Sequence, residues 1–542
     1  MNNMKNFRML RIVFVAVFLV PCMAICGSMD VAMPQIIEKN GRHALLVDGK
    51  PFFMLGGQVH NSSGWPGMMP AVWSAVEVAH ANTLEVPIYW EQIEPQPGKF
   101  DFSIADTLIK QARKHKIRLV LLWFATWKNA ANHYMPGWMK LEPVKYPNII
   151  GKNGKPLDSP SPYAKAAMEA DAKAFATVMG HLKQVDPQHT VIMVQIENEA
   201  GAGGTVRDYS PEAQELFGGQ VPPELLKPEI LKALNRPVDA TGSWQEVFGT
   251  DADEYFNAWS VARYIEFVAT AGKAVNPLPF YVNAALRDPL SDAKPPVYES
   301  GGPTDNVIPI WKAAAPAIDV LAPDFYMSGT ERAQKVFELY DRPDNALFVP
   351  EIGRGPEYVK YLYSVIAYGG IGYSPFGIDD NGSGENEAET SVRLVALAQE
   401  YAVMNPMARE LAAWGFEGKI KSVVETEDHA VQSIDLGVWK AIVTFSSSTG
   451  RSAQPNVQPI GKAMIIQLGE NEFIFIGTLS RLTFRPLGAD SGRAWQYLKV
   501  EEGRYENGTF DPLRILNGDE TDAGGPRIGA IPRVLHITLT VR

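Results

Sequence analysis

Between about residues 50 and 380, short runs of apolar and β-branched residues alternate with longer segments in which apolar residues recur at helical spacing. Such runs are typical of buried strands, and the longer segments are typical of amphipathic helices. The strands that this pattern predicts span residues 52–59, 83–90, 118–124, 190–197, 279–286, 319–325, 346–351 and 370–376. Helices are predicted between them, among others over residues 104–116, 163–184, 254–275 and 357–368.

Eight strands that alternate with helices predict an α/β fold in which parallel strands are joined by crossover helices. This number of strands indicates a (β/α)8 TIM barrel with insertions. An open, doubly wound sheet is the alternative, but no glycine-rich phosphate-binding turn follows the first predicted strand. The longest insertion, residues 200–278, contains a glycine-rich loop and a further predicted helix over 224–234.

The pattern changes after a predicted helix over residues 388–404. Short alternating runs then follow one another, separated by Gly, Asn, Ser and Pro, which is typical of an all-β sandwich. These runs span residues 419–426, 438–445, 463–468, 472–476, 482–484 and 534–541. The sequence therefore predicts a barrel over residues 28–410 and a C-terminal β-sandwich domain over residues 411–542.

The N-terminus resembles a targeting segment. Three basic residues precede an apolar run over residues 12–25, and small residues follow it, so we predict a signal peptide over residues 1–27. The exported chain would reach the periplasm or the extracellular space. A lipid-modified Cys26, as in an outer-membrane lipoprotein, is the alternative, and an uncleaved anchor is the third option. Cys22 and Cys26 are the only cysteines, so the exported body has no disulfide framework.

Composition and charge narrow the classes of protein. Apolar residues make up 46% of the chain and charged residues 20%, which is enough for a sizeable core. The net charge of −11, without a basic block beyond the extreme N-terminus, argues against nucleic acid as a partner. The nine histidines lack metal-binding spacing and there is no phosphate loop, so we expect no metal and no cofactor. Residues 379–382 (Asp-Asp-Asn-Gly) lack the remaining ligands of a calcium loop and are interpreted as a turn. The sequence leaves the oligomeric state open.

Two predicted strands end in acidic residues. The fourth ends in Glu197-Asn198-Glu199 and the seventh ends in Glu351. In a barrel, the C-terminal ends of strands form the floor of the active site, so these carboxylates face each other across its mouth. Hydrolysis of a glycosidic bond requires one protonated carboxyl, which assists the leaving group, and one ionised carboxyl, which attacks the anomeric carbon.

Alternation along a regular strand places Glu197 and Glu199 on one face and Asn198 on the other. Because Glu199 comes last and reaches furthest into the mouth, we predict that Glu199 is the acid and that Glu351 is the nucleophile. Glu299 is the rival nucleophile, although the Gly301-Gly302-Pro303 sequence after it indicates a loop.

The Asn198-Glu199 pair, Glu351 and the segment over residues 85–102 (EVPIYWEQIEPQPGKFDF) resemble the clan of retaining barrel glycosidases. Within that clan the chain is most similar to the β-galactosidases of glycoside hydrolase family 35. The resemblance implies the same roles for Glu199 and Glu351, and the tail resembles the β-rich C-terminal domain of a bacterial branch. Many members have His where this chain has Ile93, and Cys-Ala-Glu where it has residues 128–130 (Lys-Asn-Ala). The contacts to the sugar at that turn therefore differ from those of the family.

Further candidates for substrate binding lie beside the two acids. Asn198 is expected to donate to the sugar 2-hydroxyl, and Tyr326 is expected to hydrogen-bond the nucleophile. Trp127 and Asn129, after the third strand, are expected to stack on and hydrogen-bond a sugar. Tyr89 at the end of the second strand is expected to face the pocket.

The resemblance implies an exported, retaining exo-β-galactosidase that acts on terminal β-D-galactosyl residues of oligosaccharides or plant polysaccharide side chains. Its expected partners are these carbohydrate substrates, with no membrane contact beyond a lipid on Cys26. Other members of the clan, such as an arabinosidase, a glucosidase or a mannosidase, are alternatives. A non-catalytic carbohydrate-binding protein is a further alternative, but it would have no need of two opposed acids.

Overall fold

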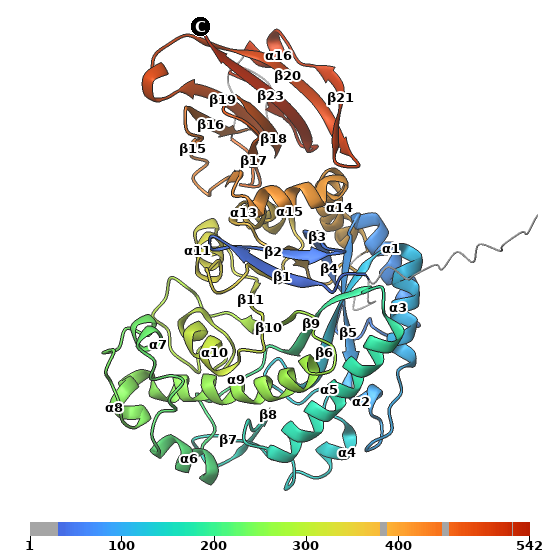
Figure 1. Ribbon diagram of the computed structural model, residues 1–542, viewed down its shortest axis with the longest axis vertical. Coiled ribbons are helices and arrows are strands. Elements are labelled where there is room, and N and C mark those ends of the chain that lie inside the picture. The colour runs from blue at the N-terminus through green and yellow to red at the C-terminus, as the bar shows by residue number, and fades with distance from the viewer. Residues whose placement is uncertain (1–30, 380–386, 447–454, 523) are drawn as a thin grey trace, which may run out of the picture.

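The computed structural model describes residues 31–379, 387–446, 455–522 and 524–542. The larger part of the chain is an α/β barrel, and an all-β part is stacked on one end of it (Figure 1). The predicted signal peptide over residues 1–27, with Cys22 and Cys26, lies outside the described residues.

Eight parallel strands close into a barrel in the order β10-β11-β12-β13-β4-β5-β6-β9. Their bounds are β4 (Met54–Gln58), β5 (Thr83–Tyr89), β6 (Arg118–Lys128), β9 (Val191–Asn198), β10 (Phe280–Ala285), β11 (Val320–Phe325), β12 (Phe348–Ile352) and β13 (Gly372–Pro375). Each coincides with one of the predicted strands. The predicted TIM barrel is therefore confirmed, and the open sheet is wrong.

Both faces of the barrel strands are buried, which explains why they are continuous apolar runs in the sequence. In β6, Leu121 and Trp123 pack outward against helices, whereas Leu122 and Phe124 point into the barrel. The inner and outer sides thus form two apolar layers around one sheet. The strands are rigidly held, and polar side chains at their C-terminal ends have fixed positions.

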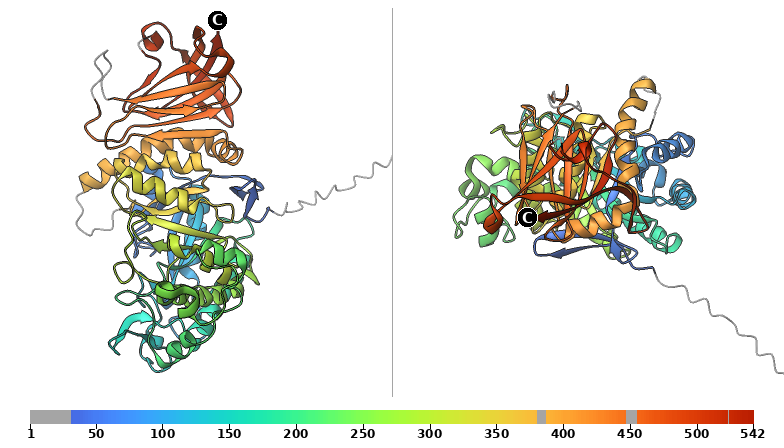
Figure 2. Two further views of the ribbon diagram at one scale, coloured as in Figure 1. Left: turned by 90° about the vertical axis from the view of Figure 1, so that its left-hand side faces the viewer. Right: turned by 90° about the horizontal axis from the view of Figure 1, so that it is seen from above.

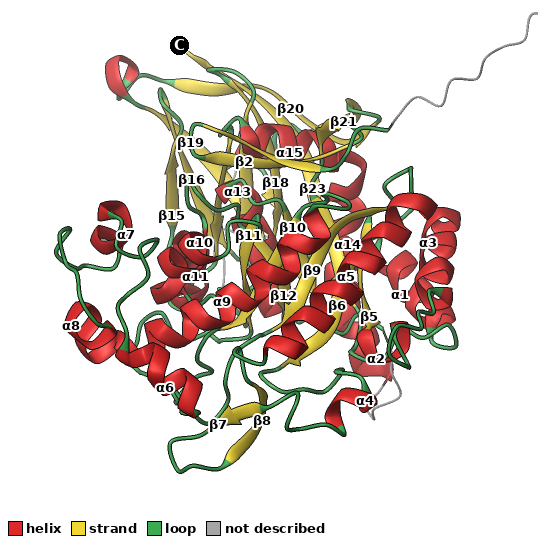
Figure 3. Ribbon diagram, turned by 60° about the horizontal axis from the view of Figure 1, so that its bottom comes forward, coloured by secondary structure: helices red, strands yellow, loops and turns green. Residues whose placement is uncertain are grey.

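Helices surround the barrel strands (Figure 3). Those around and below the sheet are α1 (Met69–Ala79), α2 (Trp90–Ile93), α3 (Ser103–His115), α5 (Lys165–Val185), α9 (Ala252–Lys273), α10 (Ile308–Ala314), α11 (Thr330–Tyr340), α12 (Pro356–Val359), α13 (Tyr361–Tyr368), α14 (Glu387–Met404) and α15 (Ala408–Phe416). In α3, for example, Ala105, Leu108, Ile109 and Ala112 are buried at helical spacing, and the opposite face is exposed. None of the helices in the described ranges has both the length and the hydrophobicity needed to cross a lipid bilayer.

Two insertions extend the end of the barrel at which its strands terminate. The first, after β6, contains α4 (Gly137–Lys140), β7 (Asn148–Ile150) and β8 (Pro156–Pro160), and the second, after β9, contains α6 (Pro211–Gly218), α7 (Pro228–Ala233) and α8 (Trp244–Phe248). The predicted helix over 224–234 is α7. Both insertions lie at the end of the molecule away from the all-β part (Figure 1).

A small antiparallel sheet that the sequence did not predict precedes the barrel. It consists of β1 (Gln35–Lys39), β2 (Arg42–Val47) and β3 (Lys50–Pro51). Leu45 and Val47 of β2 belong to the same apolar cluster as Val120 and Ile192 in the barrel interior. This sheet therefore closes the end of the barrel at which its strands begin.

The C-terminal part is a sandwich of a six-stranded sheet, β14-β17-β18-β23-β20-β21, and a four-stranded sheet, β15-β16-β19-β22 (Figure 2). The bounds are β14 (Ile420–Val424), β15 (Gln432–Asp435), β16 (Trp439–Phe445), β17 (Lys462–Gln467), β18 (Glu472–Thr478), β19 (Ser480–Pro486), β20 (Trp495–Glu506), β21 (Thr509–Ile515), β22 (Arg527–Ile528) and β23 (Arg533–Val541), with α16 (Asp519–Asp522) between β21 and β22. The predicted all-β sandwich is confirmed. The strands β15, β20, β21 and β22 were not predicted.

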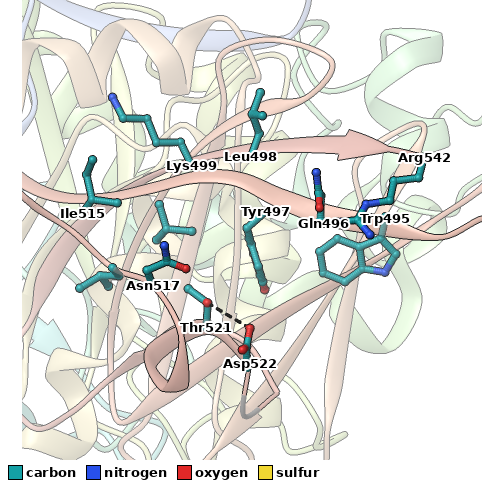
Figure 4. Close-up of a pocket in the computed structure, with 12 residues that line it drawn as sticks. Trp495, Gln496, Tyr497, Leu498, Lys499, Ile515, Asn517, Thr521, Asp522 and Arg542 are labelled. Carbon is teal, nitrogen blue, oxygen red and sulfur yellow. Dashed lines mark hydrogen bonds between the residues drawn. The ribbon is translucent and has the colours of Figure 1, made fainter.

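The sandwich contains a pocket of about 430 Å³ between β20 and the segment that carries α16. Trp495 and Tyr497 of β20 point towards Thr521 and Asp522 (Figure 4). The two aromatic rings also pack against the sandwich core, where Trp495 contacts Trp439 edge to face. The pocket is thus a gap at the edge of that core, and all its lining residues belong to the sandwich.

Candidate active site

The two predicted acids lie at the same end of the barrel. Glu199 directly follows β9, and Glu351 is the next-to-last residue of β12. The neighbour of Glu199, Asn198, places its Nδ2 3.2 Å from Oε1 of Glu351. The structure therefore brings Asn198, Glu199 and Glu351 together in one site.

Glu351 is surrounded by hydrogen-bond donors. Oε1 accepts from Gln58 Nε2 at 2.8 Å and from Asn198 Nδ2 at 3.2 Å, and Oε2 accepts from the Tyr326 hydroxyl at 2.9 Å. Its side chain is buried, since only 5% of the residue is exposed. Donors aimed at both oxygens stabilise the ionised form of a buried carboxyl. Glu351 has the environment of a nucleophile.

Tyr326 has the contact expected for it. The residue as a whole is 45% exposed, but desolvation around its hydroxyl and the negative charge of Glu351 raise the pKa of that hydroxyl far above the usual value, so it remains a donor. Its backbone oxygen accepts a hydrogen bond from the hydroxyl of Tyr358 at 2.7 Å, which holds the loop after β11 in place.

Glu199 has the environment of an acid. Burial, and after it the negative charge of Glu351, raise the pKa of Glu199 to about 7, while the ammonium of Lys128 acts in the opposite direction. The backbone N–H of Glu199 donates to Asn283 Oδ1 at 2.9 Å, and the Asn129 amide donates to its carboxyl. A large fraction of Glu199 is therefore protonated at neutral pH, as proton donation requires.

The alternation that placed Glu197 on the same face as Glu199 is wrong. Glu197 and Glu199 have φ angles of 60° and 45°, and these left-handed conformations interrupt the regular strand. Glu197 turns towards the helices, has no exposed surface and accepts from the N–H of Trp127 at 2.6 Å. Burial raises the pKa of Glu197 well above its usual value. Glu199 remains the acid of this strand that lies in the site.

The structure does not place Trp127 where we expected it. The strand β6 continues to Lys128, four residues beyond the predicted end, so Trp127 lies within the strand and not in a loop. Its ring is fully buried on the outer side and packs edge to face on Tyr264 of α9, with centroids 4.7 Å apart. As placed, Trp127 has no surface on which a sugar could stack.

Asn129 and Tyr89 make contacts within the protein that the sequence did not predict, and their binding to a sugar stays a prediction. Asn129 is exposed in a turn with a φ of 52°, and its amide is directed at Glu199. Tyr89 points into the barrel but is only 1% exposed. Its hydroxyl donates to the backbone oxygen of Asn61 at 2.7 Å and accepts from the N–H of Gly64 at 3.1 Å, so it holds the loop after β4.

Several polar residues of the site were missed by the sequence reasoning. They are Gln58, Lys128, Asn283 and Asp324. Asp324 of β11 is buried, accepts from Asn283 Nδ2 at 2.6 Å, and has a pKa raised well above its usual value by burial and by Glu351 and Glu199. The sequence could have indicated Asp324, because this residue lies next to the end of an apolar strand, as Glu351 does.

The rival nucleophile, Glu299, lies in the loop between β10 and α10 and not at a strand end. Burial raises its pKa, and its Oε2 is buried without a hydrogen-bond partner among the described residues. It lacks the set of donors that surrounds Glu351. The geometry therefore favours Glu351.

The described part of the chain holds no group of three or more His, Cys, Asp or Glu side chains arranged to bind a metal ion. Of the predicted turn over residues 379–382, only Asp379 is described. It accepts a hydrogen bond from the N–H of His60 at 2.9 Å.

The C-terminal end of a closed (β/α)8 barrel thus holds two carboxyls in different environments, an arrangement that hydrolysis of a glycosidic bond requires. Residues 44–226 match the family model of glycosyl hydrolases family 35. The matched segment holds the first four barrel strands and Glu199, and the match confirms the resemblance noted in the sequence. A second model, a domain of unknown function (DUF5597), matches residues 397–525.

Similar proteins share only part of the chain. A β-galactosidase of Xanthomonas manihotis is 29% identical over 186 residues, which are 31% of this chain and 27% of that protein. Beta-galactosidase 14 of Arabidopsis thaliana is 26% identical over 169 residues, which are 29% of this chain and 17% of that protein. The chain thus aligns with between 17% and 27% of the length of these two curated relatives. Among solved structures, a β-galactosidase from Bacillus circulans sp. alkalophilus has a TM-score of 0.48 and 15% identity, covering 66% of this chain and 57% of that one.

Proposed function

We propose that the protein is an exported, retaining exo-β-galactosidase that removes terminal β-D-galactosyl residues from oligosaccharides or plant polysaccharide side chains. The contrast between its two acids carries the proposal. Glu351 receives three hydrogen bonds, whereas the pKa of Glu199 is raised to about 7. A protonated carboxyl beside a carboxylate is what double displacement requires. The family match and the names of the relatives support galactose as the sugar.

The reaction would proceed in two steps. First, Glu199 gives its proton to the glycosidic oxygen while a carboxylate oxygen of Glu351 attacks the anomeric carbon, so the glycosidic bond breaks and a glycosyl ester forms. Then Glu199, now a carboxylate, takes a proton from water, which attacks the same carbon and releases Glu351. Asn198 Nδ2, which donates one N–H to Glu351, would donate its second N–H to the sugar 2-hydroxyl.

A screen of aryl glycosides that differ only in the sugar tests the proposed specificity. We expect the β-D-galactoside to have the highest kcat/KM, since the matched family segment carries the acid of the site. Preference for an arabinoside, a glucoside or a mannoside would support another member of the clan. Lack of turnover with every sugar would support a carbohydrate-binding protein without catalysis.

The stereochemistry of the product tests the mechanism independently of the sugar. Retaining glycosidases hold their two carboxyls about 5 to 5.5 Å apart, too close for a water molecule to attack directly. We therefore expect proton NMR to show the β-anomer as the first product, before mutarotation produces the α-anomer. An α-anomer formed first would mean that the two acids do not act as the proposed pair.

The export in this proposal is supported by the sequence of residues 1–27, in which basic residues precede an apolar run. The periplasm and the extracellular space are the compartments that such a segment indicates. The mass of the mature chain distinguishes simple cleavage before Gly27 from a lipid on Cys26, because the lipid adds the mass of its acyl chains.

A further inference from the structure

A buried lysine lies beside Asn198, the residue that precedes Glu199 and hydrogen-bonds Glu351. Lys128 ends β6 and is paired in register with Asn198 of β9. Only 5% of the residue is exposed, and its ammonium lies over the ring of Phe124, 5.3 Å from the centroid. A buried cation is costly unless its charge and its N–H groups find partners, so this position calls for a reason.

The first partner of Lys128 is the amide of Asn198. Its Nζ donates to Asn198 Oδ1 at 2.7 Å, while Asn198 Nδ2 donates to Glu351 Oε1 at 3.2 Å. An amide has an acceptor end and a donor end, and an ammonium can only donate. Lys128 therefore holds the oxygen of Asn198 on its own side and keeps the NH2 group directed at Glu351. Without the ammonium, the amide could turn and place its oxygen against the Glu351 carboxylate.

The second set of partners is the group of acids around the ammonium. Its positive charge lowers the pKa values of Glu199, Glu299 and Asp324, which come from three different parts of the barrel. The negative charge of Glu351 raises the pKa values of Glu199 and Asp324. Burial and the Glu351 carboxylate thus raise the pKa of Glu199, and the charge on Lys128 lowers it.

We propose that Lys128 is a positioning residue of this active site, which orients Asn198 towards Glu351 and stabilises the carboxylate form of Glu199. The inference rests on the proposed function, since Glu199 must be an acid in the first step and a base in the second. A cation beside Glu199 keeps the carboxylate accessible near neutral pH, so that the group can serve in both steps.

The pH profile of the Lys128→Met variant tests the proposal, because methionine keeps an unbranched stem and removes the charge. Without the cation the pKa of Glu199 rises, so we expect the alkaline limb of kcat/KM to move by about one pH unit towards higher pH. Loss of the fixed amide should also lower kcat/KM at the optimum on the order of 10-fold or more. Lys128→Arg keeps the charge and should leave the alkaline limb near its wild-type position. A limb that stays in place in Lys128→Met would overturn the proposal.

A measurement that does not depend on turnover separates this proposal from the proposed function. Removing Lys128 is expected to raise the pKa of Glu199 in the folded protein above its wild-type value of about 7. The variant then loses stability relative to wild type only at pH values above about 7, where Glu199 ionises in the folded wild-type protein. The melting temperature of Lys128→Met should therefore fall further below wild type at pH 9 than at pH 6.

The matched control carries Glu199→Gln in both proteins. The part of the pH-dependent difference that comes from Glu199 should then disappear, because glutamine does not ionise. A difference that is the same at pH 6 and pH 9, or unchanged by Glu199→Gln, would overturn the role given to Lys128. If wild type hydrolyses no aryl glycoside, the proposed function fails, but these melting curves still decide what Lys128 does.

Discussion

Replacing Glu351 with glutamine is expected to lower kcat on the order of 10³-fold or more, because an amide cannot form the glycosyl ester. The side chain keeps its size, so we expect the fold to remain intact in circular dichroism. Steady-state kinetics on the best aryl glycoside of the screen measures the loss. A 2-fluoro galactoside, which traps the covalent intermediate, should label Glu351 in the wild-type protein.

Glu299→Gln is the matched control, because it removes the half-buried carboxyl of the rival nucleophile and leaves the donors around Glu351 unchanged. This variant should keep most of its turnover. Near-normal turnover in Glu351→Gln, together with a large loss in Glu299→Gln, would assign the nucleophile to Glu299. If the 2-fluoro galactoside labels a carboxylate other than Glu351, Glu351 is not the nucleophile.

The second large effect is expected for Glu199→Ala. Substrates with poor leaving groups need the proton that Glu199 supplies, so their hydrolysis should slow by about 10²-fold to 10⁴-fold. Activated aryl glycosides need less assistance in the first step and should be affected less. Azide should restore their turnover, since a small anion can enter the space of the missing carboxyl and attack the glycosyl ester without a general base.

The pH dependence provides a further check on Glu199. Its pKa of about 7 predicts that kcat/KM of the wild type declines as pH rises through that value, because the acid form is lost. This alkaline limb should be absent in Glu199→Ala. Equal losses on both kinds of substrate without rescue by azide would contradict the role of Glu199.

The barrel could be predicted because its strands are buried on both faces and therefore appear as uninterrupted apolar runs. An apolar run does not show where the backbone of a strand departs from the regular extended conformation. Nothing in the pattern of residues 191–199 shows that Glu197 has a positive φ and turns away from the site. The pattern also stopped β6 at Phe124, because polar Thr126 and Lys128 interrupt the apolar run, although both are buried by specific partners.

Two strands of the sandwich, β20 and β21, were not predicted for a different reason. The strand β20 carries charged residues such as Lys499 and Glu501, and most of β21 is exposed, so neither forms an apolar run. At the site, the positions of Glu199, Glu351 and Tyr326 could be predicted because each lies at or next to the end of a strand. The roles of Gln58 and Asn283 could not, because they depend on side chains from strands that are distant in the sequence.

The barrel and the sandwich share one hydrophobic core at their boundary. Ile420 and Val424 of β14, together with residues of β17 and β18, belong to the same apolar cluster as the barrel helices, and Lys462 pairs with the buried Glu400 of α14 at 3.0 Å. Modular enzymes exchange appended domains readily when a flexible linker separates them. Here an exchange would leave a buried carboxylate and an apolar helix face without partners. The sandwich is thus expected to have been inherited together with its barrel, and descent in this group of proteins should be traceable equally well from either part.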